Sequence, residues 1–422
     1  MQAAAPQIPS ENGGASEVRP LDTALQATLD RAKFMDKLGR FAIYAAAGLV
    51  LLGVFLILAF LLNESAQLLL NPSKHPDGTL DKLFLPQKYE GYEHTQYVWQ
   101  TEASEGHQAK YGIPLLIWGT IKGAVWAMIF SAPLAILTAL FLAEFASSKV
   151  RNYCKAGIEL LAGVPTVVVG FVAFVVLSSI MNDYYMHNQA YFKEGRWFVM
   201  LLEIPFFAFA ACWLATRVVL KKDLSMVLKI GGCIAAVAVA VVATKLFGRV
   251  MEFVGAPVWS FCFGVNEFNA LNAILAGFCL GFAIIPIVFS VAEDALRAVP
   301  ATYREASLGL GASKWETAIQ IVVPAALPGI YAALMLGLAR AVGETMIVLM
   351  ASGNTAIFDP SPFTGMRTMS AAIAIEASEK AQFSTGYYVL FFVGAVLFML
   401  TLVLNVVTEQ VMYRLRKRYT VG

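Results

Sequence analysis

The sequence has few charged residues. Only 14% of its 422 residues are Asp, Glu, Lys or Arg, whereas an average soluble domain carries about 25%. A water-soluble enzyme of this length would lack the charge to cover its surface. The hydrophobic residues make up 58% of the chain and are gathered in long runs, many reaching the roughly 20 residues that a helix needs to cross a bilayer. The composition therefore predicts a polytopic helical membrane protein.

Cysteine, histidine and nucleotide-binding motifs are also scarce. No two of the five cysteines stand at CxxC spacing, which argues against a zinc ribbon and a disulfide framework. The four histidines fall in hydrophilic connections, where we expect solvated side chains and no metal site. The sequence contains no GxxxxGK[ST] motif to cradle a nucleotide and no Ser-His-Asp set. We therefore expect no enzyme activity and no bound cofactor in this chain. The scattered basic residues indicate no nucleic acid partner.

Apolar runs predict an all-α fold, a transmembrane bundle of about eight spans. The runs cover residues 41–62, 114–144, 158–181, 199–219, 226–247, 268–292, 329–352 and 385–412. The membrane domain extends over 114–412 and includes a hairpin at 199–247. We expect the N-terminal segment 1–40 to be cytoplasmic and partly disordered, and the basic tail 413–422 to be cytoplasmic too.

The distribution of Lys and Arg predicts the orientation. With a cytoplasmic N-terminus, the inside segments and inner helix ends hold about twice as many Lys and Arg residues as the outside segments, as the positive-inside rule requires. Both termini are then cytoplasmic, and segment 63–113 is a periplasmic loop. About fifty residues give at best a marginal core of their own. We therefore expect this loop to fold only against the membrane helices.

The cytoplasmic loop 293–328 has the pattern of two short helices joined by a tight turn. Two Ser or Thr residues are each followed by Glu three positions later, the pattern of a capping box: Thr302 with Glu305, and Ser313 with Glu316. Gly311 stands between them, where a helix end needs a left-handed residue. Pro324 is expected to end the second helix.

Apolar residues are left exposed on this otherwise polar loop. They are Leu308, Leu310, Trp315 and Ile319. One interpretation is a solvated amphipathic linker. The other is a docking element, and apolar side chains held between capped helices favour it.

The loop also resembles the EAA loop of ABC importer permeases. That pattern reads EAA, three residues, G, nine residues, I-x-L-P, and this chain has Glu305, Ala306, Gly311, Ile321 and Pro324 at the matching positions. Ser replaces the second Ala, at 307, and Val replaces Leu, at 323. The resemblance implies that this loop forms the coupling helices that sit in a cleft of an ATPase subunit. We add Trp315 to this set because of its expected exposure.

Two further stretches resemble the phosphate permeases of this family. They are GVPTVVVGF at 163–171 and ARAVGETMIVLMASGN at 339–354, the latter closer to the C-type than to the A-type subunit. The resemblance implies a type I ABC importer permease core, to which hairpin 199–247 is an addition. It also implies a bacterial inner-membrane location, pairing with an A-type permease, two ATPase subunits that use ATP and magnesium, and a periplasmic phosphate-binding protein.

Arg340 is the basic residue that snorkelling explains least. It lies about twelve residues, or roughly 18 Å, into the predicted seventh span, where an uncompensated Arg costs about 2.5–3.5 kcal/mol or more. Glu344 follows one helical turn later and shares its face. The pair is either a structural ion pair or a site where Arg340 meets an oxyanion and Glu344 orients it. Planar guanidinium suits phosphate, although one Arg beside one Glu is a poor trap for a dianion alone.

Lys122 is the next candidate for the substrate pathway. It lies near the outer end of the second span, so it either snorkels to the surface or faces a shared anion path.

The residues together predict the permease subunit of an ATP-driven phosphate importer. Another oxyanion, such as sulfate or molybdate, remains an alternative substrate. A secondary transporter or channel without an ATPase is a second alternative, but we see no internal repeat of the kind expected for it. A non-transporting scaffold would leave Arg340 without a purpose.

Overall fold

The computed structural model describes residues 23–89, 93–101, 109–189, 192, 249 and 267–419. The chain forms two compact units, residues 1–60 and residues 61–422. Hairpin 199–247 and residues 1–22 lie outside the described residues, so the predictions made for them stay predictions.

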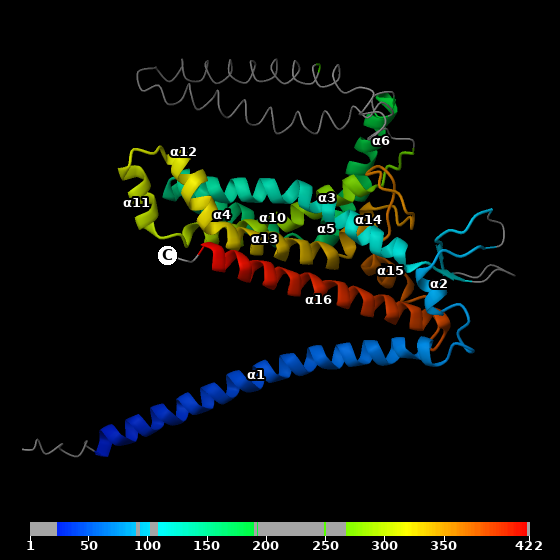
Figure 1. Cartoon of the computed structure of the whole chain (residues 1–422), viewed down its shortest axis with the longest axis horizontal. Helices are drawn as coiled ribbons and strands as arrows, with labels where there is room; N and C mark the ends of the chain where they lie inside the picture. The colour runs from blue at the N-terminus through cyan, green and yellow to red at the C-terminus, as the bar shows by residue number, and fades with distance from the viewer. Residues whose placement is uncertain are drawn as a thin grey trace, which may run out of the picture. The chain divides into compact units, whose positions relative to one another are not determined.

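Helices make up most of the described chain (Figure 1). The elements before the undescribed stretch are α1 (Thr23–Leu70), α2 (Leu80–Phe84), β1 (Trp99–Gln100), β2 (Lys110–Tyr111), α3 (Ile113–Leu140), the π-helical turn η1 (Phe141–Phe145), α4 (Ser148–Ala162), α5 (Thr166–Val172), the π turn η2 (Ala173–Leu177) and α6 (Ser178–His187). Those after it are α10 (Ala273–Arg297), α11 (Ala301–Gly309), α12 (Lys314–Thr317), the π turn η3 (Ala318–Val322), α13 (Val323–Gly343), α14 (Met346–Ala351), α15 (Met369–Glu376) and α16 (Thr385–Tyr419).

The described residues contain six helices long and apolar enough to cross a membrane. Each corresponds to a predicted span, with three differences. The predicted first span, 41–62, lies within a longer helix, α1, which begins at Thr23. The predicted third span, 158–181, is interrupted at Gly163–Pro165, because Pro165 is the N-cap of α5. The predicted seventh span, 329–352, begins earlier, at Lys314, and its helix ends at Gly343.

Helix α10 is the centre of the second unit. It packs most extensively against α3 and then against α13, and most of its residues are buried. Gly277 allows the close approach of α3, because a Cβ at this position would lie 2.5 Å from the Cβ of Trp126. Small residues at a helix contact are a common way to bring membrane helices together. In Figure 1 α3, α10, α13 and α16 run side by side, with α11 and α12 at one end.

The opposite end carries the predicted periplasmic segment. Here β1 and β2 form a two-residue antiparallel ribbon, with Trp99 opposite Tyr111. Both residues share one buried apolar cluster with Leu83 of α2 and with residues of α3, α15 and α16. The segment thus packs against the membrane helices, as predicted from its size. His75, expected to be solvated, is instead buried, with its ring 3.0 Å from the Thr385 hydroxyl through Nδ1.

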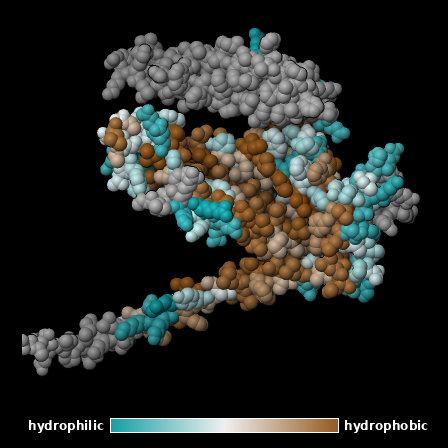
Figure 2. Space-filling view, viewed as in Figure 1, coloured by the Kyte–Doolittle hydropathy of each residue, from teal (hydrophilic) through white to brown (hydrophobic). Residues whose placement is uncertain are grey.

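The surface of this unit is divided by polarity (Figure 2). On the face shown, hydrophobic residues cover the middle of the bundle, and hydrophilic residues gather at its two ends. We call the end with α11 and α12 the loop end, and the end with β1 and β2 the ribbon end.

Candidate functional site

Arg340 and Glu344 line one hollow of about 450 Å³. Ile287, Leu336 and Gly343 also line it. Because Ile287 lies near the middle of the 25-residue helix α10, the hollow is at mid-depth in the bundle. The packing of α13 on α10 gives the same depth. A Cβ on Gly337, about one turn before Arg340, would contact Ile284 and Val288 near the middle of α10. Arg340 thus lies level with the middle of α10, although it stands in the last turn of α13 and the helix starts fifteen residues earlier than predicted. Its depth in a membrane stays a prediction.

The relation between Arg340 and Glu344 differs from the prediction. Helix α13 ends at Gly343, and Glu344 is extended, with φ −70° and ψ 135°, so the two residues do not share a helical face. No hydrogen bond or ion pair between their side chains occurs in the described residues. The Glu344 carbonyl oxygen instead accepts a hydrogen bond of 2.7 Å from the Ser370 hydroxyl. The prediction of one helical face was wrong because α13 ends before Glu344.

The Arg340 guanidinium is exposed in this chain, and Glu344 is half-buried. Among the described residues, none donates to or accepts from the Arg340 side chain. The open edge of the hollow consists of Leu336, Arg340 and Gly343, which are all exposed. A planar fork of N–H donors is thus free to bind an anion at mid-depth.

Lys122 has a different environment. It is 5% exposed, so it does not snorkel. Its ammonium donates to the Asp359 carbonyl oxygen at 3.0 Å and to the Thr364 hydroxyl at 2.9 Å. Trp118, one turn earlier on α3, donates to the same carbonyl at 3.1 Å. In this conformation Lys122 therefore anchors the loop 352–368 on α3, and it is not among the residues that line the hollow.

The loop end contains the two predicted short helices. Gly311 between them has φ +91°, and the capping box of Ser313 with Glu316 is present. The predicted box of Thr302 with Glu305 is absent, because α11 begins at Ala301 with Pro300 as its N-cap. The cap therefore lies two residues before Thr302, and no side chain contributes a hydrogen bond to it.

Pro324 does not end the second helix. Residues 314–343 form one helical span. Pro324 lies in the first turn of α13, two residues after the π turn η3 ends. A proline removes one backbone donor and crowds the preceding turn. We attribute its tolerance to the extra residue of a π turn, which changes the hydrogen-bond register at this point.

The apolar side chains predicted to be exposed at the loop end are exposed. The values are 91% for Leu310, 57% for Trp315, 43% for Leu308 and 39% for Ile319. Of the other residues of the EAA-like motif, Glu305, Ala306, Gly311 and Ile321 are exposed and Pro324 is half-buried. Trp315 lies beside Phe145 of η1, with 6.0 Å between ring centroids. The described chain thus offers an apolar surface here.

Arg304 of α11 ties these helices to the bundle. Its Nη2 and Nε lie 2.8 and 3.1 Å from Oε1 of Glu144, in η1. It also donates to the carbonyl oxygens of Leu296, at 2.8 Å, and Val299, at 2.5 Å. The side chains of Arg304 and Glu144 are both largely buried. Their hydrogen bonds are therefore charge-assisted and partly shielded from water. One guanidinium therefore links α11, the end of α3 and the end of α10.

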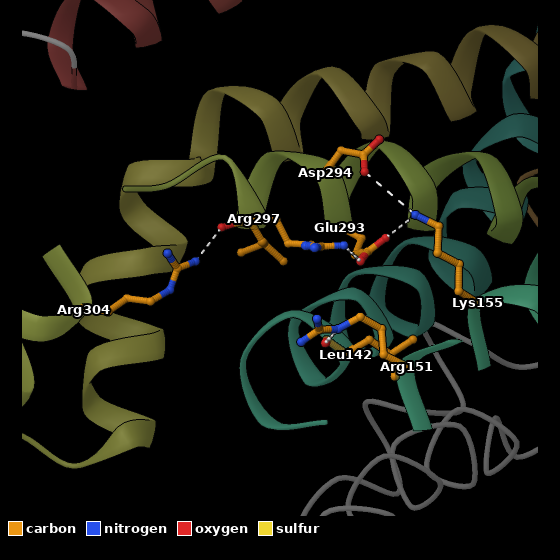
Figure 3. A network of polar contacts seen from close by, with 8 residues as sticks. Leu142, Arg151, Lys155, Glu293, Asp294, Arg297 and Arg304 are labelled. Carbon is orange, nitrogen blue, oxygen red and sulfur yellow. Dashed lines mark hydrogen bonds and ion pairs between the residues drawn. The ribbon is translucent and has the colours of Figure 1, made fainter. Parts of the chain in front are cut away.

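A second ion cluster lies next to it (Figure 3). Glu293 of α10 is fully buried, and its carboxylate lies 2.7 Å from Lys155 Nζ of α4 and 3.3 Å from Arg297 Nη1. The hydrogen bond to Glu293 raises the pKa of Lys155 above its ordinary value. Asp294, 70% exposed, lies farther from the same ammonium, at 3.9 Å. The cluster fixes α4 to α10.

Sequence reasoning missed Arg304, Glu144, Lys155 and Glu293 as functional candidates. It used the basic residues for orientation only. The available signal was the position of two carboxylates, Glu144 and Glu293, at the ends of long apolar runs, where an unpaired buried charge is costly. Pairing each with its cation required the tertiary structure, because the partners are 160 and 138 residues apart.

Comparison with known proteins agrees with this architecture. The family model for the binding-protein-dependent transport system inner membrane component matches residues 131–421. The chain is 28% identical over 309 residues to the phosphate transport system permease protein PstC of Xylella fastidiosa (strain Temecula1), covering 73% of this chain and 76% of the relative. It is 27% identical to PstC of Pasteurella multocida, covering 74% and 78%.

A solved structure of the MetNI methionine ABC transporter in inward-facing conformations is 14% identical, with a TM-score of 0.37, and covers 72% of this chain and 94% of that chain. The family model spans well over half of the sequence. The chain therefore belongs to the binding-protein-dependent transport system inner membrane components, as a multi-pass permease subunit of the ABC importer type.

Proposed function

We propose that this chain is the permease subunit of an ATP-driven importer of inorganic phosphate. The observation that carries the proposal is the Arg340 guanidinium, which lies at mid-depth in a hollow of about 450 Å³ without a partner among the described residues. A charge at this depth is expensive to keep, and a free planar fork matches two oxygens of a tetrahedral oxyanion. The relatives named as phosphate permeases support the same substrate.

Glu344 favours phosphate over other oxyanions on chemical grounds. Inorganic phosphate keeps at least one proton at neutral pH, whereas sulfate and molybdate keep none. A carboxylate accepts a hydrogen bond from the P–OH group and repels an anion that has no proton to offer. Arg340 and Glu344 line the same hollow, so one anion can contact both. The electrical neutrality of this pair is then a selectivity device.

A second permease subunit would complete the pathway. The exposed edge of the hollow at Leu336, Arg340 and Gly343 leaves one side of a bound anion uncovered in this chain. An A-type subunit facing this edge would cover that side and supply further positive groups. Lys122 belongs to the pathway in this proposal only when loop 352–368 leaves α3, because its ammonium is now bonded to that loop.

ATP would act through the loop end. In this proposal the exposed residues Leu310 and Trp315 dock on a partner ATPase subunit, which holds ATP and magnesium, while this chain holds neither. The loop end is then cytoplasmic, both termini are cytoplasmic, and the ribbon end faces a periplasmic phosphate-binding protein. The location is a bacterial inner membrane.

Phosphate uptake by the assembled transporter tests the proposal. We expect Arg340→Ala to abolish uptake and Arg340→Lys, which keeps the charge without the fork, to retain a minor part of it. Arg31→Ala removes an exposed cation that does not line the hollow, so it is the control and should transport well. Uptake that persists in Arg340→Ala would assign Arg340 a structural role. If sulfate or molybdate, instead of phosphate, stimulates ATP hydrolysis by the assembled transporter, that anion is the substrate and the phosphate assignment is wrong.

A further inference from the structure

Helix α15 (Met369–Glu376) connects the hollow to the ribbon end. Near its start, the Ser370 hydroxyl donates to the Glu344 carbonyl oxygen at 2.7 Å, and the Met369 N–H donates to the Thr120 hydroxyl of α3 at 3.1 Å. The helix has eight residues, of which five are buried, so it is about 12 Å long. The first turn of α15, which we describe as a short rigid rod, thus holds the backbone of Glu344 at the hollow.

Its other end carries a buried ion cluster. Glu376 is 2% exposed, and its Oε1 accepts hydrogen bonds from Trp99 Nε1 of β1 at 2.8 Å and from Arg367 Nη2 at 2.7 Å. A tryptophan N–H of the ribbon-end segment 63–113 therefore bonds to α15, in addition to the apolar cluster that the segment shares with this helix. This is a buried, charge-assisted contact between parts of the chain 277 residues apart.

The Glu376 cluster is incompletely paired. Glu376 Oε2 and Arg367 Nε are both buried, and neither has a hydrogen-bond partner among the described residues. Buried groups of this kind are normally satisfied. A two-pronged pair between this carboxylate and this guanidinium would satisfy both atoms. The same two side chains could therefore pair in a second way, and a connecting element with two states needs such an alternative.

We propose that Glu376 is a positioning residue through which the ribbon-end segment sets the position of Glu344, with α15 as the rod between them. This proposal rests on the proposed function. In that function a periplasmic partner binds segment 63–113, and the contacts through α15 would transmit this binding to the anion site. The route is Trp99, Glu376, α15, Ser370 and the Glu344 carbonyl.

Other contacts of the segment bypass α15 and provide the control. His75 pairs with Thr385 at the first residue of α16, and Lys380 Nζ donates to the Thr101 carbonyl oxygen at 3.1 Å. Thr385→Val removes one such contact and keeps the side-chain shape. It should loosen the segment without loosening the rod.

Cysteine labelling at the hollow measures the position of the break directly. Gly343 is exposed and has open space for a Cβ, so Gly343→Cys is a suitable reporter in the full-length chain. The reagent is a small water-soluble maleimide, applied to opened membrane vesicles. The same chain without Gly343→Cys gives the background from the native cysteines, and a melting curve of each variant verifies the fold.

Glu376→Gln should raise the labelling rate at position 343 about threefold or more, the range expected when one contact of a coupled network is lost. Trp99→Phe keeps an aromatic side chain but loses the N–H donor, and it should raise the rate in the same way. Ser370→Ala should also raise it. Because both ends belong to one rod, Glu376→Gln and Ser370→Ala combined should change the rate no more than either alone. Thr385→Val should leave the rate unchanged.

Labelling does not depend on phosphate, so it separates this proposal from the transport proposal. An unchanged rate in both Glu376→Gln and Trp99→Phe would overturn the rod, and so would an equal rise in Thr385→Val. In the assembled transporter, the same two variants should reduce stimulation of the ATPase by phosphate-loaded binding protein and leave unstimulated hydrolysis as it is. If labelling responds but phosphate has no effect on hydrolysis, the rod stands and the substrate assignment falls.

Discussion

At the scale of single residues, the scarce charges inside the apolar bundle are of two kinds. Lys122 is buried and donates to two oxygens of loop 352–368, so its charge is used in holding the structure together. Arg340 has no such partner in the described chain and lines an open hollow. An Arg near the middle of a bilayer costs about 2.5–3.5 kcal/mol on insertion scales. Holding that charge unpaired favours a role in binding.

Glu344→Gln tests the role of the carboxylate in selectivity. The amide keeps the size and loses the negative charge, so the hollow no longer repels an anion without a proton. We expect sulfate and molybdate to compete with phosphate uptake at least about tenfold better in this variant, the effect of one charged hydrogen bond. The measurement is competition of each anion against labelled phosphate. Selectivity equal to that of the unchanged chain would remove Glu344 from anion recognition.

Among these residues, the depth of Arg340 could be predicted and the geometry of Glu344 could not. Depth follows from the length of an apolar run at 1.5 Å per residue. Helix α13 ends at Gly343, and Ser370, 26 residues away, binds the Glu344 carbonyl oxygen just beyond this end. Gly343 is a local signal for a helix end, but a partner 26 residues away has no signature in residues 339–346.

At the scale of elements, the short helices α11 and α12 contact two π turns, η1 after α3 and η3 before α13. Gly311 and the Ser313–Glu316 capping box were predictable, because both signals are local. The continuation of the helix through Pro324 was not, because a π turn has no clear sequence signature. Six predicted spans correspond to helices of the described chain, since an apolar run of about 20 residues is a strong signal by itself.

Glu144→Gln tests whether the ion pair between Arg304 and Glu144 transmits movement from α11 to α3. The amide keeps the size but loses the charge, which weakens a partly buried ion pair by about 2 kcal/mol; the bonds from Arg304 to Leu296 and Val299 stay. We expect ATP hydrolysis to continue while less phosphate enters per ATP used. The ratio of uptake to hydrolysis in reconstituted vesicles is the measurement.

Asp294→Asn is the matched control for that experiment. Asp294 is also a carboxylate at the loop end of α10, but its side chain is 70% exposed and its ion pair with Lys155 is long, at 3.9 Å. An exposed pair of this kind contributes about 0–1 kcal/mol. The ratio should stay normal in Asp294→Asn. A normal ratio of uptake to hydrolysis in Glu144→Gln as well would mean that the Arg304–Glu144 ion pair only stabilises the fold.

At the scale of the whole molecule, the two ends of the second unit are polar and the middle is apolar (Figure 2), which is the surface of a protein that spans a bilayer. Exposed apolar residues also occur at both polar ends, and the most exposed one described is at the loop end. Leu310 is 91% exposed there, far from the apolar middle of the bundle. A large exposed apolar group at a polar end is a mark of an interaction site.

Leu310→Glu should therefore prevent a partner ATPase from co-purifying with the chain, without preventing membrane insertion. A charged group placed in a desolvated apolar contact is unfavourable by several kcal/mol, enough to lower the recovered ATPase by about a hundredfold. Leu85→Glu is the matched control, because Leu85 is also exposed, at 58%, but lies at the ribbon end. The measurement is the amount of ATPase subunit recovered per purified permease chain. Equal recovery from both variants would move the docking surface away from α11 and α12, whereas loss in Leu310→Glu alone would assign it to them.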